Sequence, residues 1–339
     1  MKITINQYLK FALNIVFLIF LAMVADQLIG RIIRYYYFEQ KSGQQFRTTY
    51  AMNSANSDIL VFGSSRATHH YVPEIFEDSL NMSMYNSGRE GSLLLYSYAV
   101  FKATVKRHTP KIVIFDVIPA DLCYDESSID RLSSLLPYYR THPEIREIVE
   151  LKGPLEKYKL ISEIYPFNSS LLSIIMGNLK RDDLSGEDQK GYIPLYGRIS
   201  DSVVSDLKLD ESTIDTVKVR MLQEVIDYCD ANNIRLLVIQ SPYFADILDS
   251  NSENLLEQIT QDNKVPYLNY TNRTEFLTCP ELFWDQGHLN DQGARFYSSL
   301  IAHQIARFIN ESVDQHSETA EITRNMRAEN NAATAYSGN

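Results

Sequence analysis

Short apolar runs bounded by turn-forming residues recur through the chain, and runs of this kind predict buried β-strands. Between them, apolar residues repeat with the period of amphipathic helices. The predicted strands cover residues 58–63, 83–86, 111–117, 234–240 and 266–269. The predicted helices cover residues 91–107, 212–231, 251–262 and 291–310. Strands that alternate with helices predict an α/β fold, a three-layer α/β/α sandwich with a mostly parallel five-stranded sheet.

A longer apolar run lies near the N-terminus, from Phe11 to Ile29. As a helix it is about 28 Å long, at about 1.5 Å per residue, which is enough to cross a bilayer. Arg31, Arg34 and an aromatic string at 35–38 follow it, as at a membrane–water interface. The run predicts a single-pass signal anchor; a cleaved signal peptide and a buried core helix are the alternatives. The first two place the main domain outside the cytoplasm, on the periplasmic or extracellular side.

The spacing between the third and fourth predicted strands is unusually long, because residues 118–233 separate them. The crossover helix occupies only the last part, so residues 120–210 are predicted to form a helical insertion. Insertions at the carboxyl ends of strands usually shape access to a site. We therefore expect a lid or cleft wall, with a purely structural cap as the alternative. Residues 313–339 lack apolar periodicity and predict a disordered tail. The chain thus divides into a membrane segment (1–39), an α/β domain (40–312) and this tail.

Charge and cysteine content narrow the class of function. The net charge is −11 and the sequence has no extended Lys/Arg cluster, so we expect no nucleic-acid partner. Cys123, Cys229 and Cys279 lack the spacing of metal ligands, and no phosphate-binding glycine fingerprint is present. We expect neither a metal nor a cofactor. Cys229 fits an apolar core, and a disulfide between Cys123 and Cys279 stays open.

Two short motifs carry candidate chemistry. Gly63-Ser64-Ser65-Arg66 follows the first predicted strand, which places Ser65 at the carboxyl end of that strand, where parallel sheets bind ligands. Far along the chain, Asp285 stands three residues before His288, just ahead of the last helix. A serine hydroxyl needs a base to become a nucleophile, and the base needs an orienting acid. Ser65, His288 and Asp285 are therefore a candidate catalytic triad.

At these residues the chain resembles the SGNH/GDSL hydrolase superfamily. The first block of that family reads Gly-Asp-Ser-Leu or a variant, with the serine as nucleophile; here Ser65 matches the serine and Ser64 replaces the Asp. Asp285 and His288 match the family's Asp-x-x-His block. The resemblance implies a flavodoxin-like SGNH fold over residues 57–311 and catalysis by these three residues.

The resemblance also implies an oxyanion hole. The N–H groups of Ser65 and of Gly88, which matches the glycine of the second block, are the expected donors. The family's third block, Gly-x-Asn-Asp, has no match here, because the equivalent strand ends at Asp116 without the Gly or the Asn. One donor typically contributes about 3–4 kcal/mol to transition-state stabilisation. Asn86 and Asn168 are candidates to replace it.

The remaining polar residues near the motifs have alternative interpretations. Arg66 is expected either to line the pocket or to pair with an acid such as Asp116, which ends the third strand. His69 and His70 are predicted to be structural, although their position beside Ser65 places one of them near the rim of the pocket.

Because it lacks the third block, the chain is similar to the membrane-anchored branch of the superfamily. That branch includes alginate O-acetyltransferases and the D-alanyl-lipoteichoic acid biosynthesis protein. The resemblance implies a serine acyl esterase or O-acyltransferase that acts on an O-acetylated cell-envelope polysaccharide through an acyl-Ser65 intermediate. A transferase would need a membrane-bound O-acyltransferase partner. The alternatives are a catalytically inactive glycan-binding or scaffold protein and a membrane-surface lipid esterase.

Overall fold

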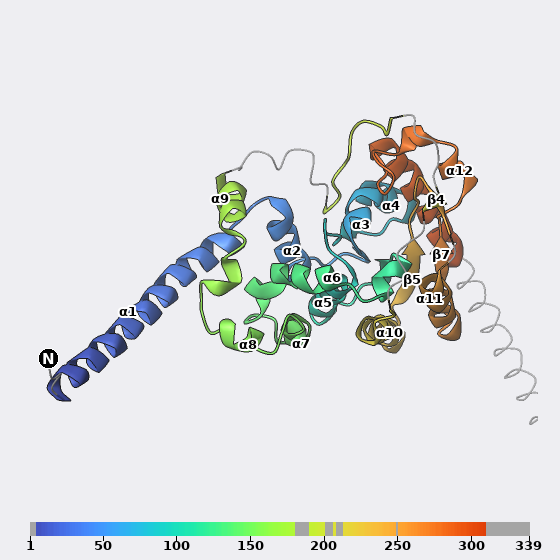
Figure 1. Cartoon of the computed structure of the whole chain (residues 1–339). Coiled ribbons are helices and arrows are strands. Elements are labelled where there is room, and N and C mark those ends of the chain that lie inside the picture. The colour runs from blue at the N-terminus through green and yellow to red at the C-terminus, as the bar shows by residue number, and fades with distance from the viewer. Residues whose placement is uncertain (1–4, 180–189, 201–205, 208–212, 249, 310–339) are drawn as a thin grey trace, which may run out of the picture.

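The centre of the molecule is a five-stranded parallel sheet (Figure 1). It is seen in a computed structural model that describes residues 5–179, 190–200, 206–207, 213–248 and 250–309. In spatial order the strands are β2 (Met84–Asn86), β1 (Ile59–Phe62), β3 (Ile112–Asp116), β5 (Arg235–Gln240) and β7 (Tyr267–Asn269). All five strands were predicted, and the predicted α/β/α sandwich is confirmed.

Helices cover both faces of the sheet because its side chains are apolar on both sides. Leu60 and Phe62 of β1 face one core, while Ile59 and Val61 face the other. The first core is completed by α2 (Gly43–Asn53), α5 (Leu94–Val105), α10 (Thr216–Ala231) and α11 (Asn251–Asp262). The second is completed by α3 (Ser65–His70), α4 (Pro73–Leu80), α12 (Thr274–Leu277) and the helix over residues 291–309.

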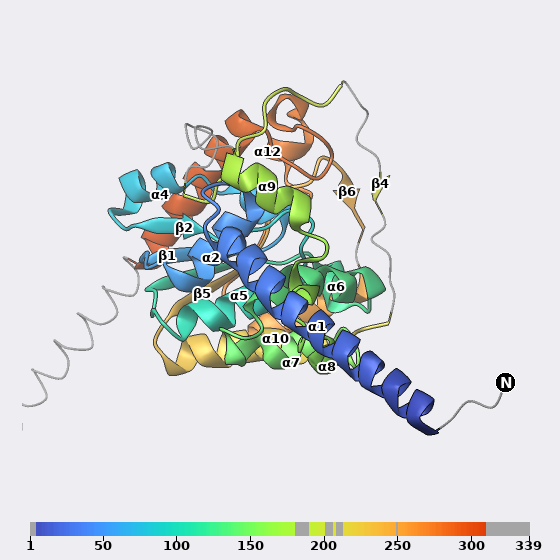
Figure 2. The ribbon, with the colours of Figure 1, turned by 90° about the vertical axis from the view of Figure 1, so that its left-hand side faces the viewer.

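A single long helix, α1 (Ile5–Phe38), projects from the domain (Figures 1 and 2). Its length and composition allow residues Asn6–Phe38 to cross a membrane, with a mean hydropathy of 2.2 in the most apolar window. That window is not buried, so the alternative of a buried core helix is wrong. Residues 6–25 are exposed throughout, whereas residues from Asp26 onward contact the domain.

The insertion is largely helical from residue 119 to residue 179, and this part lies between α1 and the sheet (Figure 1). Its described residues 190–200 contain no helix, and residues 206–207 form a strand. Its core packs on the last turn of α1, where the rings of Tyr37 and Phe167 are 5.3 Å apart. The segments are η1 (Pro119–Leu122), α6 (Glu126–Arg131), η2 (Leu132–Tyr138), η3 (Pro143–Ile145), α7 (Arg146–Glu150), α8 (Glu156–Lys159), η4 (Tyr165–Phe167) and α9 (Leu171–Leu179). Parts of the predicted insertion, and the whole tail predicted at 313–339, lie outside the described residues.

Two details differ from the sequence-based picture. A second, two-stranded parallel sheet joins β4 (Asp206–Leu207) to β6 (Asp246–Ile247), and strands of two residues are too short to show a periodicity. A turn of 3₁₀-helix, η5 (Pro280–Leu282), precedes the Asp285 motif.

The cysteines are free, so Cys123 and Cys279 form no disulfide, and Cys229 is buried as expected.

Candidate active site

The candidate nucleophile follows β1, the strand at which the order of the sheet reverses. β2 lies on one side of β1, and β3 and the later strands lie on the other side. Doubly wound sheets bind ligands in the crevice at such a point. Ser65 is the first residue of α3 and is partly exposed. Gly63 lets the strand end lie close to its neighbours, because a Cβ there would lie 2.9 Å from Asp116 Cβ. Ser64 accepts a hydrogen bond from the Arg66 N–H at 3.3 Å and so caps α3.

The structure brings Ser65, His288 and Asp285 together into a continuous hydrogen-bonded chain. Ser65 Oγ lies 2.8 Å from His288 Nε2. His288 Nδ1 lies 2.9 and 3.0 Å from the two carboxylate oxygens of Asp285. A carboxylate can only accept, so Nδ1 carries the proton and Nε2 is left to accept from the serine hydroxyl. These are the contacts that a nucleophile, a general base and an orienting acid require.

A closed loop holds Asp285 and His288 in place. Phe283 and Leu289 pair as an antiparallel bridge across its base, and the Trp284 N–H donates to His288 O at 2.9 Å. Within the loop, Asp285 Oδ1 accepts from the N–H groups of Gly287 and His288, both at 2.8 Å. Partial burial raises the pKa of Asp285, but the bonds from His288 and from these N–H groups outweigh burial and lower the pKa below its ordinary value. Asp285 is therefore ionised at neutral pH.

His70 connects the nucleophile helix to this loop. Its Nε2 accepts from the Leu289 N–H at 3.0 Å, so its Nδ1 carries the proton and donates to Ser241 Oγ at 3.1 Å. Burial, together with the nearby Arg66 charge, lowers the pKa of His70 well below its ordinary value. His70 is therefore a neutral, structural histidine, and it fixes the position of the residue that follows His288.

Arg66 is bonded to the residue after β5 rather than to Asp116. Its guanidinium donates to Ser241 Oγ at 3.1 Å and to the Ser241 carbonyl, and it lies 4.0 Å from the centre of the Tyr243 ring. Arg66 Nη1 and Asp116 Oδ1 are both buried without a hydrogen-bond partner, so the predicted pairing of Arg66 with Asp116 is not formed. Burial raises the pKa of Asp116, an effect that the Arg66 charge partly offsets. Asp116 accepts from Tyr71 Oη at 2.7 Å.

The predicted oxyanion donors are not equally free. The Gly88 N–H donates to Asn86 Oδ1 at 3.0 Å. The Asn86 amide nitrogen donates to Ala67 O at 2.7 Å and to Tyr71 O at 3.1 Å. Asn86 therefore ties the end of β2 to α3 instead of facing the nucleophile. Of the three predicted donors near the sheet, only the Ser65 N–H has no acceptor among the described residues.

Asn168 lies apart from the triad. It is exposed and follows η4 in the part of the insertion that packs on α1, and its N–H donates to Tyr165 O. The structure thus does not bring Asn168 to Ser65. A different part of the insertion, residues 190–199, borders the site, because the Ile193 carbonyl accepts from His69 Nδ1 at 2.8 Å.

His69 lies beside the triad, as the position of the two histidines next to Ser65 predicted for one of them. Its ring centre is 5.5 Å from that of His288. Because Nδ1 donates to the Ile193 carbonyl, its Nε2 faces Glu90 Oε1 at 3.4 Å. The contact with His69 lowers the pKa of Glu90 below its ordinary value. Glu90 is therefore an anion beside the site.

Three aromatic and polar residues at the site were not identified from the sequence: Ser241, Tyr243 and Trp284. Ser241 and Tyr243 follow the carboxyl end of β5, as Asp116 stands at the carboxyl end of β3. Their position after a predicted strand was therefore a signal in the sequence that they lie near the site. Trp284 precedes Asp285, is 46% exposed, and has its ring 6.4 Å from that of His288. It offers a flat apolar surface beside the base. Within the described residues, no group of His, Cys, Asp and Glu side chains is arranged to hold a metal ion.

Comparison with known proteins gives only distant likenesses. No family model and no curated protein match the chain. One similar solved structure is a candidate acylhydrolase from Bacteroides fragilis NCTC 9343, with 12% identity and a TM-score of 0.40, covering 80% of this chain and 99% of that one. Another is a candidate lipolytic protein of the G-D-S-L family from Desulfitobacterium hafniense DCB-2, with 10% identity and a TM-score of 0.35, covering 72% and 97%. The functional argument therefore rests on the geometry of the site.

Proposed function

We propose that this chain is a serine acyl esterase or O-acyltransferase that works through an acyl-Ser65 intermediate. The observation that carries the proposal is the unbroken chain from Ser65 Oγ to His288 Nε2, at 2.8 Å, and from His288 Nδ1 to Asp285, at 2.9 Å. Ser65 is more than 200 positions from the Asp285–His288 pair in sequence, and the three residues meet at the carboxyl end of β1. A serine that served only as a helix cap would not need a histidine and an ionised carboxylate aligned behind it.

The geometry supports a double displacement. Ser65 Oγ attacks the acyl carbonyl carbon while its proton passes to His288 Nε2, and Asp285 stabilises the imidazolium that forms. The tetrahedral intermediate collapses, the bond to the alcohol breaks, and the leaving oxygen takes the proton from His288. A water molecule then attacks the acyl-serine in an esterase, or a second hydroxyl does so in a transferase, and its proton passes to His288 Nε2. The bond between the acyl carbon and Ser65 Oγ then breaks, and His288 returns the proton to Ser65 Oγ.

Limited oxyanion stabilisation favours slow hydrolysis. The Ser65 N–H is the free donor, whereas Gly88 and Asn86 bond to each other. A missing donor typically costs about 3–4 kcal/mol in the transition state. The same observation favours a second candidate function, a binding or scaffold protein with an intact triad but little turnover.

For the substrate, we propose an O-acetylated cell-envelope polysaccharide. The exposed Trp284 ring beside His288 supports this, since an aromatic face next to a nucleophile suits the apolar face of a sugar ring. The projecting helix α1 supports attachment to a membrane. As part of the proposal, we place the domain on the periplasmic or extracellular side of that membrane. A transferase would take its acyl group from a membrane-bound O-acyltransferase partner.

The test is hydrolysis of 4-nitrophenyl acetate by the full chain in detergent micelles. We expect Ser65→Ala and His288→Ala each to lower the rate by about 10²–10⁴-fold. His303→Ala, at an exposed position on the last helix, should leave it unchanged. Release of one nitrophenolate per chain without further turnover would show that the acyl-enzyme forms but is not hydrolysed. Turnover that begins when an oligosaccharide is added would identify a transferase. Hydrolysis that survives Ser65→Ala would contradict the proposal.

A further inference from the structure

The projecting helix is joined to the domain by contacts between its second half and residues 162 and 163. Asp26, within α1, accepts from Ser162 Oγ at 2.5 Å and from the Glu163 N–H at 2.8 Å. One turn later Gly30 lies against Glu163, so closely that a Cβ would lie 2.2 Å from Glu163 Cβ. Arg34 pairs with Glu163 at 2.6 Å. The point at which α1 leaves the protein is therefore fixed at Asp26.

The length of α1 beyond that point matches a bilayer. Residues 6–25 are exposed throughout. Twenty residues of helix span about 30 Å, the thickness of the hydrocarbon core. If this stretch crosses the membrane, the protein surface around Asp26 lies at the level of the lipid headgroups.

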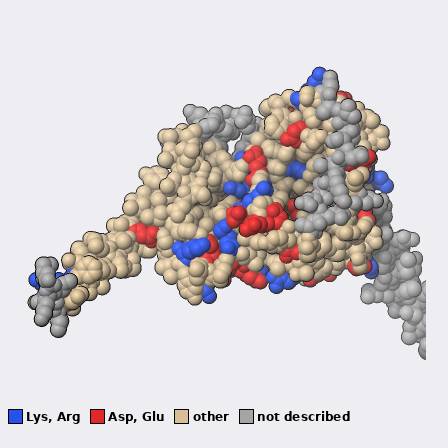
Figure 3. All heavy atoms as spheres, in the orientation of Figure 1, with Lys and Arg blue, Asp and Glu red and all other residues tan. Residues whose placement is uncertain are grey.

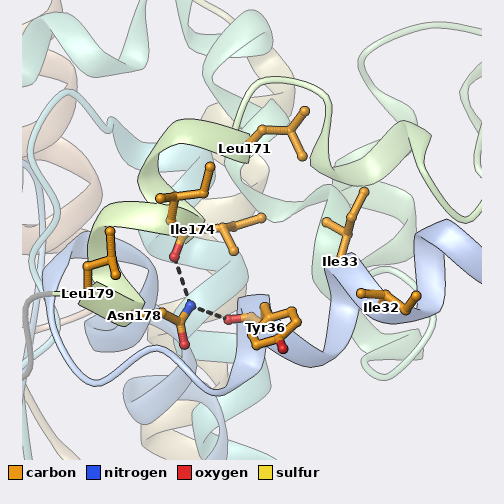
Figure 4. A pocket seen from close by; sticks show the side chains of 8 residues that line it. Ile32, Ile33, Tyr36, Leu171, Ile174, Asn178 and Leu179 are labelled. Atoms are coloured by element: carbon orange, nitrogen blue, oxygen red, sulfur yellow. Dashed lines mark hydrogen bonds between the residues drawn. The ribbon is translucent and has the colours of Figure 1, made fainter.

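A second apolar helix lies beside the last turns of α1. The Asn178 amide nitrogen of α9 donates to Tyr36 O at 2.9 Å, which joins the two helices, and to Ile174 O at 2.8 Å within α9 (Figure 4). Between the helices is an open groove of about 460 Å³. Its apolar lining comes from α1 and from α9: Ile32, Ile33, Tyr36, Leu171, Ile174 and Leu179 (Figure 4).

The outer face of α9 consists of large apolar side chains that are highly exposed. Leu172 is 74% exposed and Leu179 is 73% exposed, and Ile175 and Met176 are exposed beside them. The helix contains no charged residue from Leu171 to Leu179. The surface of the lobe that carries α9 is correspondingly uncharged (Figure 3). Contiguous apolar patches of this kind mark an interaction surface.

Exposed apolar residues also lie on the other side of α1. Leu155, Tyr158 and Ile161 are exposed on and next to α8, directly before the segment that Asp26 binds. Lys157 and Lys159 flank Tyr158 and are exposed. Figures 1 and 2 both show α8 and α9 on opposite sides of the α1 axis. Apolar side chains interspersed with lysines are typical of surfaces that enter the headgroup region of an anionic membrane.

We propose that α9 and the segment from Leu155 to Ile161 form a membrane-seating surface, with phospholipid acyl chains occupying the groove between α1 and α9. The surface continues the exposed apolar face of α1, and Ile32 follows Asp26 by only about 9 Å of helix. A tilt of α1 of about 20°, which is usual for membrane helices, toward α9 would bring α9 closer to the bilayer and move the opposite flank away from it. Lipid therefore covers the patch without requiring any partner. The inference does not depend on the activity of Ser65.

The test uses the full chain in vesicles of phosphatidylcholine and phosphatidylglycerol with brominated acyl chains, which quench tryptophan. The sequence has a single tryptophan, so Trp284→Phe gives a background for Trp probes placed one at a time. Leu172→Trp and Leu179→Trp report on α9, and Phe17→Trp reports on the exposed part of α1. Phe296→Trp, exposed on the helix over residues 291–309 across the molecule from α1, is the matched control (Figure 1).

We expect the two α9 probes to be quenched at least about twofold more than the Phe296→Trp control, as for side chains at the acyl boundary. Quenching equal to that control, with Phe17→Trp strongly quenched, would show that water or protein covers α9 and would overturn the proposal. Loss of α9 quenching as the protein-to-lipid ratio rises would identify a second copy as the occupant instead. Absence of quenching at Phe17→Trp would remove the membrane placement on which the proposal rests.

Discussion

At the scale of single residues, Asp285 determines whether His288 can act as a base. Its carboxylate fixes the Nδ1–H tautomer and leaves Nε2 free toward Ser65. An asparagine keeps the shape but offers an amide, which allows the wrong tautomer. We predict that Asp285→Asn lowers the rate of 4-nitrophenyl acetate hydrolysis by about 10³–10⁴-fold.

Asp262→Asn, at an exposed position at the end of α11, is the matched control and should have no effect. Equal rates for Asp285→Asn and Asp262→Asn would remove Asp285 from the catalytic machinery.

The burial of His70 leads us to predict that the stability of the fold depends on pH. Burial holds its pKa well below 6.5 in the folded chain, so the unfolded chain binds a proton near pH 6.5 that the native chain does not. By linkage, the free energy of unfolding falls as pH decreases below about 6.5, by at most about 1.4 kcal/mol per pH unit for one proton.

In His70→Gln this loss should disappear, since glutamine does not titrate and its Oε1 can still accept from the Leu289 N–H. We expect the difference in melting temperature between pH 7.5 and pH 5.5, values about one unit on either side of 6.5, to be smaller in His70→Gln than in the wild type. His303→Gln, at an exposed position, should keep the wild-type difference. An unchanged difference in His70→Gln would contradict the assignment of a neutral His70.

Only part of the site follows from local sequence. Ser65 and the Asp285–His288 pair could be predicted because each sits in a short motif at the border of a recognisable strand or helix. The bonds from His70 to Ser241 and Leu289 join residues about 170 and 219 positions away, and no local pattern encodes them. Asn86 was predicted to face an oxyanion; its amide instead satisfies the carbonyls at the end of α3, a requirement visible only in the folded chain.

At the scale of elements, the contact of α1 with the insertion depends on a glycine. Because a Cβ at Gly30 would lie 2.2 Å from Glu163 Cβ, any side chain there must push α1 away. We predict that Gly30→Leu destabilises the full chain in micelles by about 1–3 kcal/mol, as overpacked sites do, measured by chemical unfolding.

Ala22→Leu adds the same bulk to the exposed part of α1 and should be neutral. Equal stabilities of the two variants would indicate that α1 is not docked at Gly30.

The strands were predictable because parallel strands buried on both faces are continuous apolar runs, as in Ile112–Asp116. The position of the insertion was not predictable, since its short 3₁₀ and α segments dock on α1 through side chains such as Phe167 that have no periodic signature. That is also why Asn168 was placed near the triad and is found beside α1 instead.

At the scale of the whole molecule, the folded domain begins earlier than the predicted boundary at residue 40. Tyr37 is 2% exposed, and its hydroxyl donates to Tyr138 Oη at 3.3 Å. Arg34 neutralises the buried Glu163. We predict that removing residues 1–25 leaves the stability of the domain within about 1 kcal/mol, whereas removing residues 1–39 lowers it by about 3–5 kcal/mol, as for loss of a buried aromatic side chain.

Urea unfolding of the two truncated chains, followed by circular dichroism, measures the difference. Equal midpoints would mean that residues 26–39 contribute nothing to the domain core.

The central claim is that Ser65 is an activated nucleophile, and labelling by a fluorophosphonate probe tests it most directly. The full chain would be labelled in micelles and the modified residue located by fragmentation of the peptide that contains Ser64 and Ser65. We predict modification of Ser65 alone, lost in His288→Ala, because Ser65 is the only serine of the described residues that is hydrogen-bonded to His288. Modification of Ser64, or no modification of a chain shown to be folded, would contradict the account and favour a binding or scaffold protein.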